Sequence, residues 1–113
     1  MNEAQNILKK YFGYENFRPG QEEIIGHILN HDDVLGIMPT GAGKSVCYQV
    51  PAMILEGVTI VISPLISLMK DQVDSLNEIG IPATFINSTL SYSNYEQTIE
   101  NIIHNVYKII YVA

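Results

Sequence analysis

The chain has 113 residues, a net charge of -6 and a single cysteine, Cys47. Its length allows one domain that buries a core, and its acidic balance argues against a basic nucleic-acid footprint within this stretch. No segment approaches the roughly 18 apolar residues of a membrane span, and the first residues lack the basic and apolar regions of a signal peptide. A lone cysteine rules out an internal disulfide, so we expect a protein of the reducing cytoplasm with no membrane association.

Residues 1–33 are predicted to form two helices. The apolar face of the first helix holds Ala4, Ile7, Leu8 and Tyr11. Gly13 is expected to end this helix, and Pro19 is expected to begin the next one, because proline suits the first helical position. The apolar face of the second helix holds Ile24, Ile25, Ile28 and Leu29. The polar residues 30–33 predict a turn.

The stretch from Val34 to Tyr48 has the sequence VLGIMPTGAGKSVCY. Val34 to Met38 is an apolar run that predicts a buried strand, the glycines after it predict a loop, and the apolar residues after Ser45 predict a helix. Backbone N–H groups at the start of a helix can hold phosphates, and glycines let the backbone approach them closely. This order of elements therefore predicts a phosphate-binding loop.

Two side chains in this loop have the chemistry that a nucleotide needs. Lys44 would reach the β- and γ-phosphates, and the hydroxyl of Ser45 would coordinate Mg²⁺. The core G-x-G-K-S is intact, but the complete phosphate-loop pattern asks for glycine where this chain has Met38. The alternative is a glycine-rich turn followed by a solvated lysine.

The middle of the chain predicts helix, strand and helix. The helix after the loop carries Val46, Cys47, Val50, Met53 and Ile54, and Pro51 should kink or shorten it. A strand is predicted from Val58 to Ile62. Ser63 is expected to be the N-cap of a further helix, with Pro64 at its first position and Gly80 at its end. The inner face of this helix holds Ile66, Met69, Val73 and Leu76.

The last third predicts two strands around one helix. The strands are expected near Ala83 to Ile86 and from Ile109 to Val112. Ser93 and Glu96 have the spacing of a capping box. The helix that they begin would bury Tyr95, Ile99, Ile102, Ile103 and Val106. Strands that alternate with helices predict an α/β fold in which a parallel sheet is covered by helices on both faces.

Four stretches of the chain match the motifs of one family. They are Phe12-Gly13-Tyr14 with Phe17-Arg18-Pro19-Gly20-Gln21, Met38 to Ala52, Ile62 to Val73, and Tyr111-Val112-Ala113. With them the chain resembles the beginning of the first motor lobe of RecQ-type superfamily 2 DNA helicases. Phosphate loops in that family commonly begin with Met-Pro-Thr-Gly, which accounts for Met38, whereas Ala42 stands where many members have a third glycine.

The resemblance implies an incomplete P-loop NTPase lobe of the RecA-like type. Residues 1–33 would be adenine-recognition helices, and residues 34–113 would be the αβ core, which stops before an acidic Mg²⁺ motif. Tyr14 and Arg18 would sandwich the adenine of ATP, and Gln21 would hydrogen-bond to its edge, as an aromatic ring, a planar cation and an amide permit. Alternatively, Tyr14 and Gln21 only pack the N-terminal helices.

By the same resemblance, the phosphates and Mg²⁺ contact one continuous segment. Its members are Met38, Pro39, Thr40, Gly41, Ala42, Gly43, Lys44 and Ser45, of which the last two would also be catalytic. The segment that holds Ser63, Pro64 and Lys70 would approach the DNA backbone. The alternative for that segment is a capped amphipathic helix with no ligand.

The resemblance implies that the full-length protein is an ATP-dependent DNA helicase. It would use ATP and Mg²⁺ to unwind duplex DNA in the 3′-to-5′ direction during replication, recombination and repair, acting where single strands meet duplex. This chain alone is expected to be inactive. The alternatives are a superfamily 2 RNA helicase, a non-catalytic nucleotide-binding module, and a P-loop kinase. Kinases usually supply lid arginines, and the one arginine here, Arg18, precedes the loop.

His27 and His31 are four residues apart and could share one face of a helix as a metal pair. No third ligand accompanies them, so we expect a solvated helix face.

Overall fold

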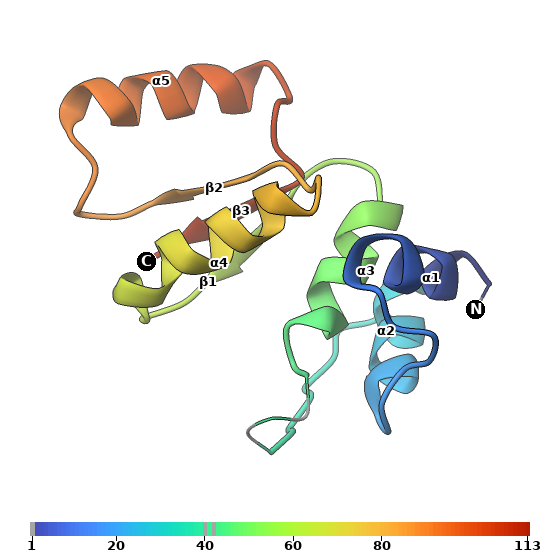
Figure 1. Cartoon of the computed structure of the whole chain (residues 1–113). Coiled ribbons are helices and arrows are strands. Elements are labelled where there is room, and N and C mark those ends of the chain that lie inside the picture. Colours follow the sequence, from blue (N-terminus) through green and yellow to red (C-terminus); the bar gives the residue numbers. More distant parts are fainter. Residues whose placement is uncertain (1, 40, 42) are drawn as a thin grey trace. The chain divides into compact units, whose positions relative to one another are not determined.

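The computed structural model describes residues 2–39, 41 and 43–113. The chain forms two compact units, Met1–Glu56 and Gly57–Ala113 (Figure 1). The phosphate-loop residues therefore share a unit with the N-terminal helices. The division of roles between residues 1–33 and residues 34–113 stays a prediction. Among the described residues, every helix is too short or too polar to cross a membrane.

Four helical segments build the first unit. They are α1 (Asn2–Ile7), η1 (Leu8–Phe12), α2 (Gln21–Leu29) and α3 (Val46–Ile54). Gly13 follows η1 with a φ of 77°, a left-handed conformation that glycine adopts without strain. α3 packs against both α1 and α2. The core between them holds Ala4, Leu8, Ile25 and Val50, surrounded by Ile7, Phe12, Phe17, Leu29, Val46 and Ile54.

The turn before α2 differs from the prediction, because Pro19 does not begin the helix. The first helical residue is Gln21, and Gly20 is the N-cap with a φ of 87°. The Gln21 N–H donates to the Arg18 carbonyl at 3.1 Å. Proline at the second position and a left-handed glycine at the third make residues 18–21 a type II turn. This turn, which we call the 18–21 turn, places the side chains of Arg18 and Gln21 at its two ends.

The strand predicted from Val34 to Met38 does not form. These residues have no regular secondary structure, and Leu35 and Ile37 are each 88% exposed. A parallel strand is stabilised by hydrogen bonds to its neighbours and by burial on both faces. No strand among the described residues pairs with this segment. The apolar run therefore lacks the partner that would order it.

Pro51 lies inside α3, which continues beyond it to Ile54. The ring of Pro51 is fully buried. Burial of this ring helps to offset the backbone hydrogen bond that proline cannot make.

The second unit is a three-stranded parallel sheet with two helices. In chain order these are β1 (Thr59–Ile62), α4 (Ile66–Glu78), β2 (Ala83–Ile86), α5 (Tyr92–Ile103) and β3 (Ile109–Val112). The strand order is β1-β3-β2, with Thr59 and Ala83 both opposite Ile109. The strands predicted for residues 83–86 and 109–112 are confirmed, and the first strand begins one residue later than predicted.

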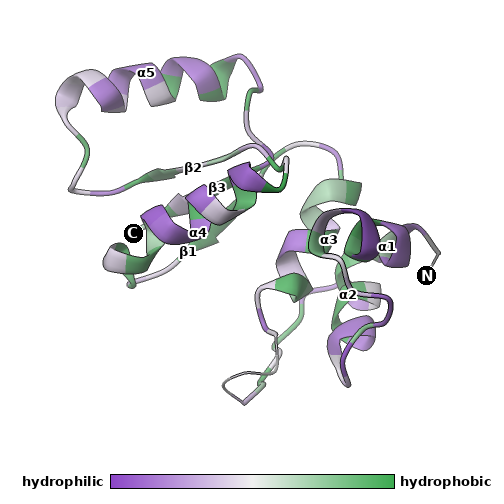
Figure 2. Ribbon diagram, in the orientation of Figure 1, coloured by the Kyte–Doolittle hydropathy of each residue, from purple (hydrophilic) through white to green (hydrophobic). Residues whose placement is uncertain are grey.

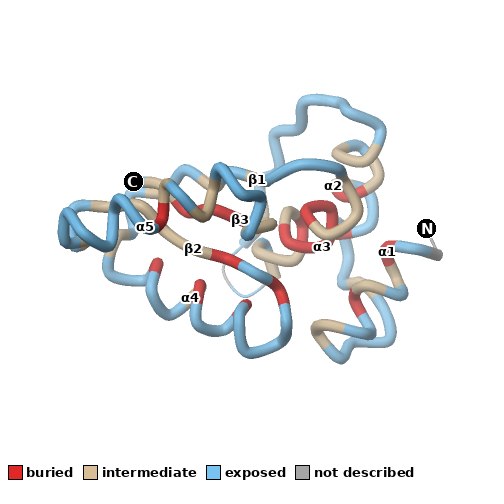
Figure 3. The backbone as a smooth tube through the Cα atoms, turned by 90° about the horizontal axis from the view of Figure 1, so that it is seen from above, coloured by how far each residue is buried: buried red, intermediate tan, exposed pale blue. Residues whose placement is uncertain are grey.

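The central strand and α4 form most of the core of this unit. Its buried apolar residues are Met69, Val73, Leu76, Ile81, Ala83, Ile109, Ile110 and Tyr111. The connections β1-α4-β2 and β2-α5-β3 run in opposite directions across the sheet, so right-handed crossovers place α4 and α5 on opposite faces. Figure 3 shows the two helices on opposite sides of the strands, and Figure 2 shows hydrophobic and hydrophilic residues alternating along both. Cover on both faces is thus confirmed within this unit.

Two predicted helix starts in the second unit are wrong. α4 begins at Ile66 rather than at Pro64, and the Ser63 hydroxyl accepts a hydrogen bond from the Leu65 N–H at 3.1 Å in a turn before the helix. α5 is capped by Ser91, whose hydroxyl accepts from the Asn94 N–H at 3.1 Å. Ser91 has the extended conformation that an N-cap needs, whereas Ser93 lies inside the helix.

The inner face of α5 is also narrower than predicted. Tyr95, Ile103 and Val106 are 43%, 66% and 47% exposed. Ile99 and Ile102 are partly buried. The buried residue of α5 is Thr98, whose hydroxyl donates to the Asn94 carbonyl at 2.8 Å. A threonine that satisfies its hydroxyl within the helix can be buried at little cost, which apolar periodicity does not reveal.

Candidate nucleotide site

The two described glycines of the loop have left-handed backbone angles. Gly41 and Gly43 have φ angles of 85° and 78°, in the left-handed region that side chains rarely adopt. Successive backbone groups in such conformations can form concave anion sites. Two predicted phosphate-binding residues, Thr40 and Ala42, lie outside the described residues.

The 18–21 turn is hydrogen-bonded to the glycine loop at two points. Arg18 Nη1 donates to the Gly41 carbonyl at 2.6 Å, and Gln21 Nε2 donates to the Gly43 carbonyl at 2.9 Å. Gln21 Oε1 accepts from the Arg18 backbone N–H at 2.8 Å, and its side chain is buried. The structure thus joins two of the residues predicted for adenine to the residues predicted for phosphate.

A side chain at position 43 would collide with the present position of the Gln21 amide. A Cβ built on Gly43 would lie 2.5 Å from Gln21 Nε2 and 3.6 Å from Arg18 Nη1. At Gly41 no atom lies within 4 Å of such a Cβ. Glycine at position 43 therefore suits both the left-handed backbone angle and the close approach of Gln21.

Lys44 and Ser45 lie at the start of α3. Lys44 is exposed and Ser45 is partly buried. Ser45 is the N-cap residue of α3. In the described structure its hydroxyl makes no capping hydrogen bond to the helix. Its carbonyl accepts from the Gln49 N–H at 2.9 Å. The positive end of the helix dipole lies here, which favours bound anions.

A small cleft of about 90 Å³ adjoins the loop. It is lined by Tyr14, Asn16, Arg18, Gln21, Gly43 and Val46. All three residues predicted for adenine thus line one cleft. Pockets that enclose a whole ligand are usually about 300–1,000 Å³, so this cleft fits the edge of a ring rather than a buried nucleotide. Tyr14 is 51% exposed, which leaves its ring open to a base that approaches from solvent.

Met38 lies against the helix that follows the loop. Its sulfur accepts a weak hydrogen bond from the Cys47 thiol, with 3.7 Å between the two sulfur atoms. Cys47 is buried, and this burial raises the pKa of its thiol above the ordinary value. The neutral thiol of Cys47 is therefore favoured, and Cys47 packs in the core as predicted. Pro39, the next residue after Met38, is exposed.

A larger groove of about 810 Å³ lies between α2 and residues 33–39. Its walls include Ile24, Leu35 and Ile37, and its lining contains neither the glycines of the loop nor Lys44. The groove is open because residues 34–38 have no partner strand. Its apolar walls do not suit a polyphosphate.

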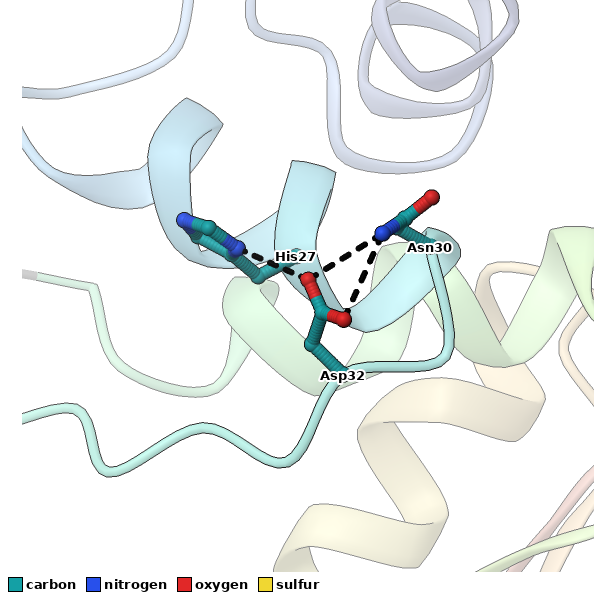
Figure 4. A network of polar contacts seen from close by, with 3 residues as sticks. All are labelled: His27, Asn30 and Asp32. Atoms are coloured by element: carbon teal, nitrogen blue, oxygen red, sulfur yellow. Dashed lines mark hydrogen bonds and ion pairs between the residues drawn. The ribbon is translucent and has the colours of Figure 1, made fainter.

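The two histidines considered for a metal do not pair. His31 follows the end of α2 and has a φ of 62°. His27 Nδ1 contacts Asp32 Oδ2 at 3.0 Å, and Asn30 Nδ2 donates to both oxygens of the same carboxylate (Figure 4). The bond from His27, helped by Asn30, lowers the pKa of Asp32. Within the described part of the chain, no group of three His, Cys, Asp or Glu side chains could hold a metal.

The sequence model of the DEAD/DEAH box helicase family matches residues 18–113 of this chain. The chain belongs to the DEAD/DEAH box helicase family. It is similar to proteins named ATP-dependent DNA helicase RecQ, with 51% identity to the one from Bacillus subtilis over 100% of this chain. Identity to the one from Haemophilus influenzae is 51% over 97% of the chain. The resemblance to RecQ-type helicases is confirmed.

These helicases are much longer than this chain, which spans 19% of the Bacillus subtilis protein and 18% of the Haemophilus influenzae protein. A putative ATP-dependent RNA helicase of Acanthamoeba polyphaga mimivirus is 46% identical over 96% of the chain, which spans 20% of it. A solved structure of a hypothetical ATP-dependent RNA helicase from Sulfolobus tokodaii aligns with 100% of this chain and 34% of its own, with a TM-score of 0.72 and 22% identity. This last likeness confirms the fold alone.

The segment predicted to approach DNA, which holds Ser63, Pro64 and Lys70, lies in the second unit. Lys70 Nζ donates to Asp74 Oδ2 at 2.7 Å on the exposed side of α4, and this hydrogen bond raises the pKa of Lys70. Asp74 already partly neutralises that charge. Ser63 uses its hydroxyl in the turn before α4, and Pro64 is exposed. A role of these residues in DNA binding stays a prediction.

Sequence reasoning missed two residues that line the small cleft, Asn16 and Val46. Asn16 lies between the motif positions Tyr14 and Arg18, and Val46 directly follows Ser45. Proximity to the motif was the available signal for both. It did not distinguish them from neighbours that face elsewhere.

Proposed function

We propose that this chain is part of the ATP-binding lobe of a RecQ-type DNA helicase. The observation that carries the proposal is the pair of hydrogen bonds from Arg18 and Gln21 to the carbonyls of Gly41 and Gly43. These bonds join the 18–21 turn to the glycine loop, so the residues that we propose for the base and for the phosphates are neighbours. Membership of the helicase family and 51% identity to proteins named DNA helicase support DNA as the substrate.

The residues of the loop fit a triphosphate. Left-handed glycines without Cβ atoms let the backbone N–H groups face phosphate oxygens. In our proposal, Lys44 neutralises the β- and γ-phosphates, and the Ser45 hydroxyl holds Mg²⁺. The metal would offset the charge that develops as water attacks the γ-phosphate in line. The acidic residues that activate this water would come from the rest of the full-length protein.

The cleft beside the loop is proposed to recognise adenine. Tyr14 offers an aromatic face and Arg18 a planar cation, and both are exposed enough to close on a ring from solvent. Arg18 would have to leave the Gly41 carbonyl in order to stack on the base. Asn16 and Val46 complete the wall of the cleft.

Two other functions compete with this proposal. An RNA helicase is the nearer one, because the mimivirus relative at 46% identity is named as such. A P-loop kinase is disfavoured because the single arginine, Arg18, is hydrogen-bonded to the loop backbone rather than placed on a lid.

ATP hydrolysis by the full-length protein tests the proposal. Hydrolysis of MgATP should rise when single-stranded DNA is added and should stop when EDTA removes Mg²⁺. Single-stranded RNA of the same sequence should stimulate it less. Stimulation by RNA alone would favour the RNA helicase, and nucleotide binding with no hydrolysis in either case would favour a non-catalytic module.

Residues 1–113 in isolation are expected to bind DNA weakly. Their net charge is -6, which opposes the counterion release that drives binding to phosphates. Lys70, the one cation in the segment predicted to approach DNA, is paired with Asp74. Fluorescence anisotropy with labelled single-stranded DNA at low salt would measure the affinity, with the full-length protein as the control. Sub-micromolar binding by residues 1–113 would contradict the expectation.

A further inference from the structure

Gln21 is engaged at both ends of its amide. The side chain is only 3% exposed. Its oxygen accepts from the Arg18 backbone at 2.8 Å, and its nitrogen donates to the Gly43 carbonyl at 2.9 Å. A residue whose task was only to bind a base would present these groups to the ligand. Here the amide instead joins the 18–21 turn to the phosphate loop.

The bond to the Gly43 carbonyl also orients an N–H group. The structure has no cis peptide bonds among its described residues. In a planar trans peptide the carbonyl and the N–H point in opposite directions. Because Gln21 holds the Gly43 carbonyl, the N–H of Lys44 in the same peptide must point away from the 18–21 turn. That N–H lies directly before α3, where a phosphate would accept a hydrogen bond from it.

We infer that Gln21 positions the phosphate loop for the phosphates themselves, whether or not a base is present. This inference rests on the proposed function, since it assumes that the loop binds a nucleotide. Gln21 acts through the Gly43–Lys44 peptide and is a positioning residue. The approach is close, because a Cβ at position 43 would lie 2.5 Å from Gln21 Nε2 and would displace the amide.

Arg18 adds a second hydrogen bond from the 18–21 turn to a carbonyl of the loop. Its Nη1 holds the Gly41 carbonyl at 2.6 Å, so both described glycines of the loop have their carbonyls turned to the 18–21 turn. Arg18 is exposed, and water competes for its donors. Buried Gln21 should therefore hold the loop more firmly than Arg18 does.

A ligand with phosphates and no base separates this inference from simple adenine recognition. If Gln21 only recognises adenine, its loss weakens the binding of ATP and leaves the binding of tripolyphosphate unchanged. If Gln21 positions the loop, its loss weakens both by a similar factor. One lost hydrogen bond to the backbone should lower each affinity at least about threefold.

The experiment uses isothermal titration of the full-length protein with MgATP and with magnesium tripolyphosphate. Gln21→Ala removes both hydrogen bonds of the side chain. Gln21→Glu keeps the acceptor for the Arg18 N–H but turns an oxygen toward the Gly43 carbonyl, so it isolates the loop contact. Tyr14→Leu is the matched comparison. Tyr14 and Gln21 both line the cleft, but it is Gln21 that donates a hydrogen bond to the Gly43 carbonyl. Unfolding temperatures would check that each variant is folded.

Both Gln21 variants should lose affinity for tripolyphosphate and for ATP together, whereas Tyr14→Leu should lose affinity for ATP alone. Wild-type affinity for tripolyphosphate in the Gln21 variants would overturn the inference and leave the proposed function standing. Failure of the wild-type protein to bind MgATP would instead overturn the proposed function, and the inference with it.

Discussion

Replacing Lys44 with alanine is expected to lower ATP hydrolysis by the full-length protein at least about a hundredfold, the usual loss when one preorganised charge-stabilising group is removed. Lys44 follows Gly43 directly before α3, and in our proposal its ammonium group neutralises the β- and γ-phosphates. The side chain is exposed, so the fold should keep its stability to within about 0.5 kcal/mol. Phosphate release from MgATP would measure the first effect and thermal unfolding the second.

Lys9→Ala is the matched control for the loss of one positive charge. Lys9 is an exposed lysine of η1 that pairs with Glu15 at 3.4 Å, and it does not line the cleft. Its replacement should leave ATP hydrolysis unchanged. Wild-type hydrolysis in the Lys44→Ala variant would contradict the assignment of residues 38–45 as a phosphate loop.

Gly43→Ala is expected to abolish measurable ATP binding and to destabilise the first unit. The φ of 78° at this position costs a residue with a Cβ about 1–2 kcal/mol. The new methyl group would also lie 2.5 Å from Gln21 Nε2. Gln21 must then move and give up its bond to the Gly43 carbonyl, at a further cost of about 0.5–1.5 kcal/mol. Titration with MgATP and thermal unfolding would measure the two effects.

Two other glycines calibrate this result. Gly41→Ala meets the same conformational strain, with a φ of 85°, but no steric contact, so it should weaken binding less than Gly43→Ala. Gly26→Ala lies inside α2 with no atom within 4 Å of the added Cβ. It should leave ATP affinity unchanged and stability equal or slightly higher. ATP affinity of Gly43→Ala equal to that of Gly26→Ala would show that the loop does not need the contact with Gln21.

The strands of the second unit could be predicted from sequence, but the segment before the loop could not. Residues 83–86 and 109–112 are short apolar runs, and they pair with each other in one sheet. Val34 to Met38 is equally apolar, yet Leu35 and Ile37 are exposed. The difference is the presence of a paired strand, which is a tertiary property. Apolar character indicates that a segment tends to be buried, and the neighbours decide whether it is.

Helix starts were less predictable because several serines compete for them. Ser91 and Ser93 are both capable N-caps, and the conformation of the chain before the helix selects Ser91. In the same way, Pro64 is compatible with a helix start but lies in the turn that precedes α4. These errors shift boundaries by two residues and leave the order of elements intact.

The placement of the proposed site residues was predictable where it depends on residues adjacent in sequence. Lys44 and Ser45 follow the glycines directly, so their placement at the start of α3 follows from the motif. The bonds from Arg18 to Gly41 and from Gln21 to Gly43 join residues 23 and 22 positions apart. No local pattern encodes such contacts, and the role of Gln21 in positioning the loop could be inferred only from the structure.

Strand separation by the full-length protein tests most directly the central claim that this chain binds the ATP that drives a DNA helicase. The substrate is a labelled DNA duplex with a 3′ single-stranded tail, with matched 5′-tailed DNA and 3′-tailed RNA duplexes beside it. We predict that the wild-type protein separates the 3′-tailed DNA only with MgATP, and that the Lys44→Ala variant does not. Separation of the RNA duplex alone, or of DNA by the Lys44→Ala variant at the wild-type rate, would contradict the account.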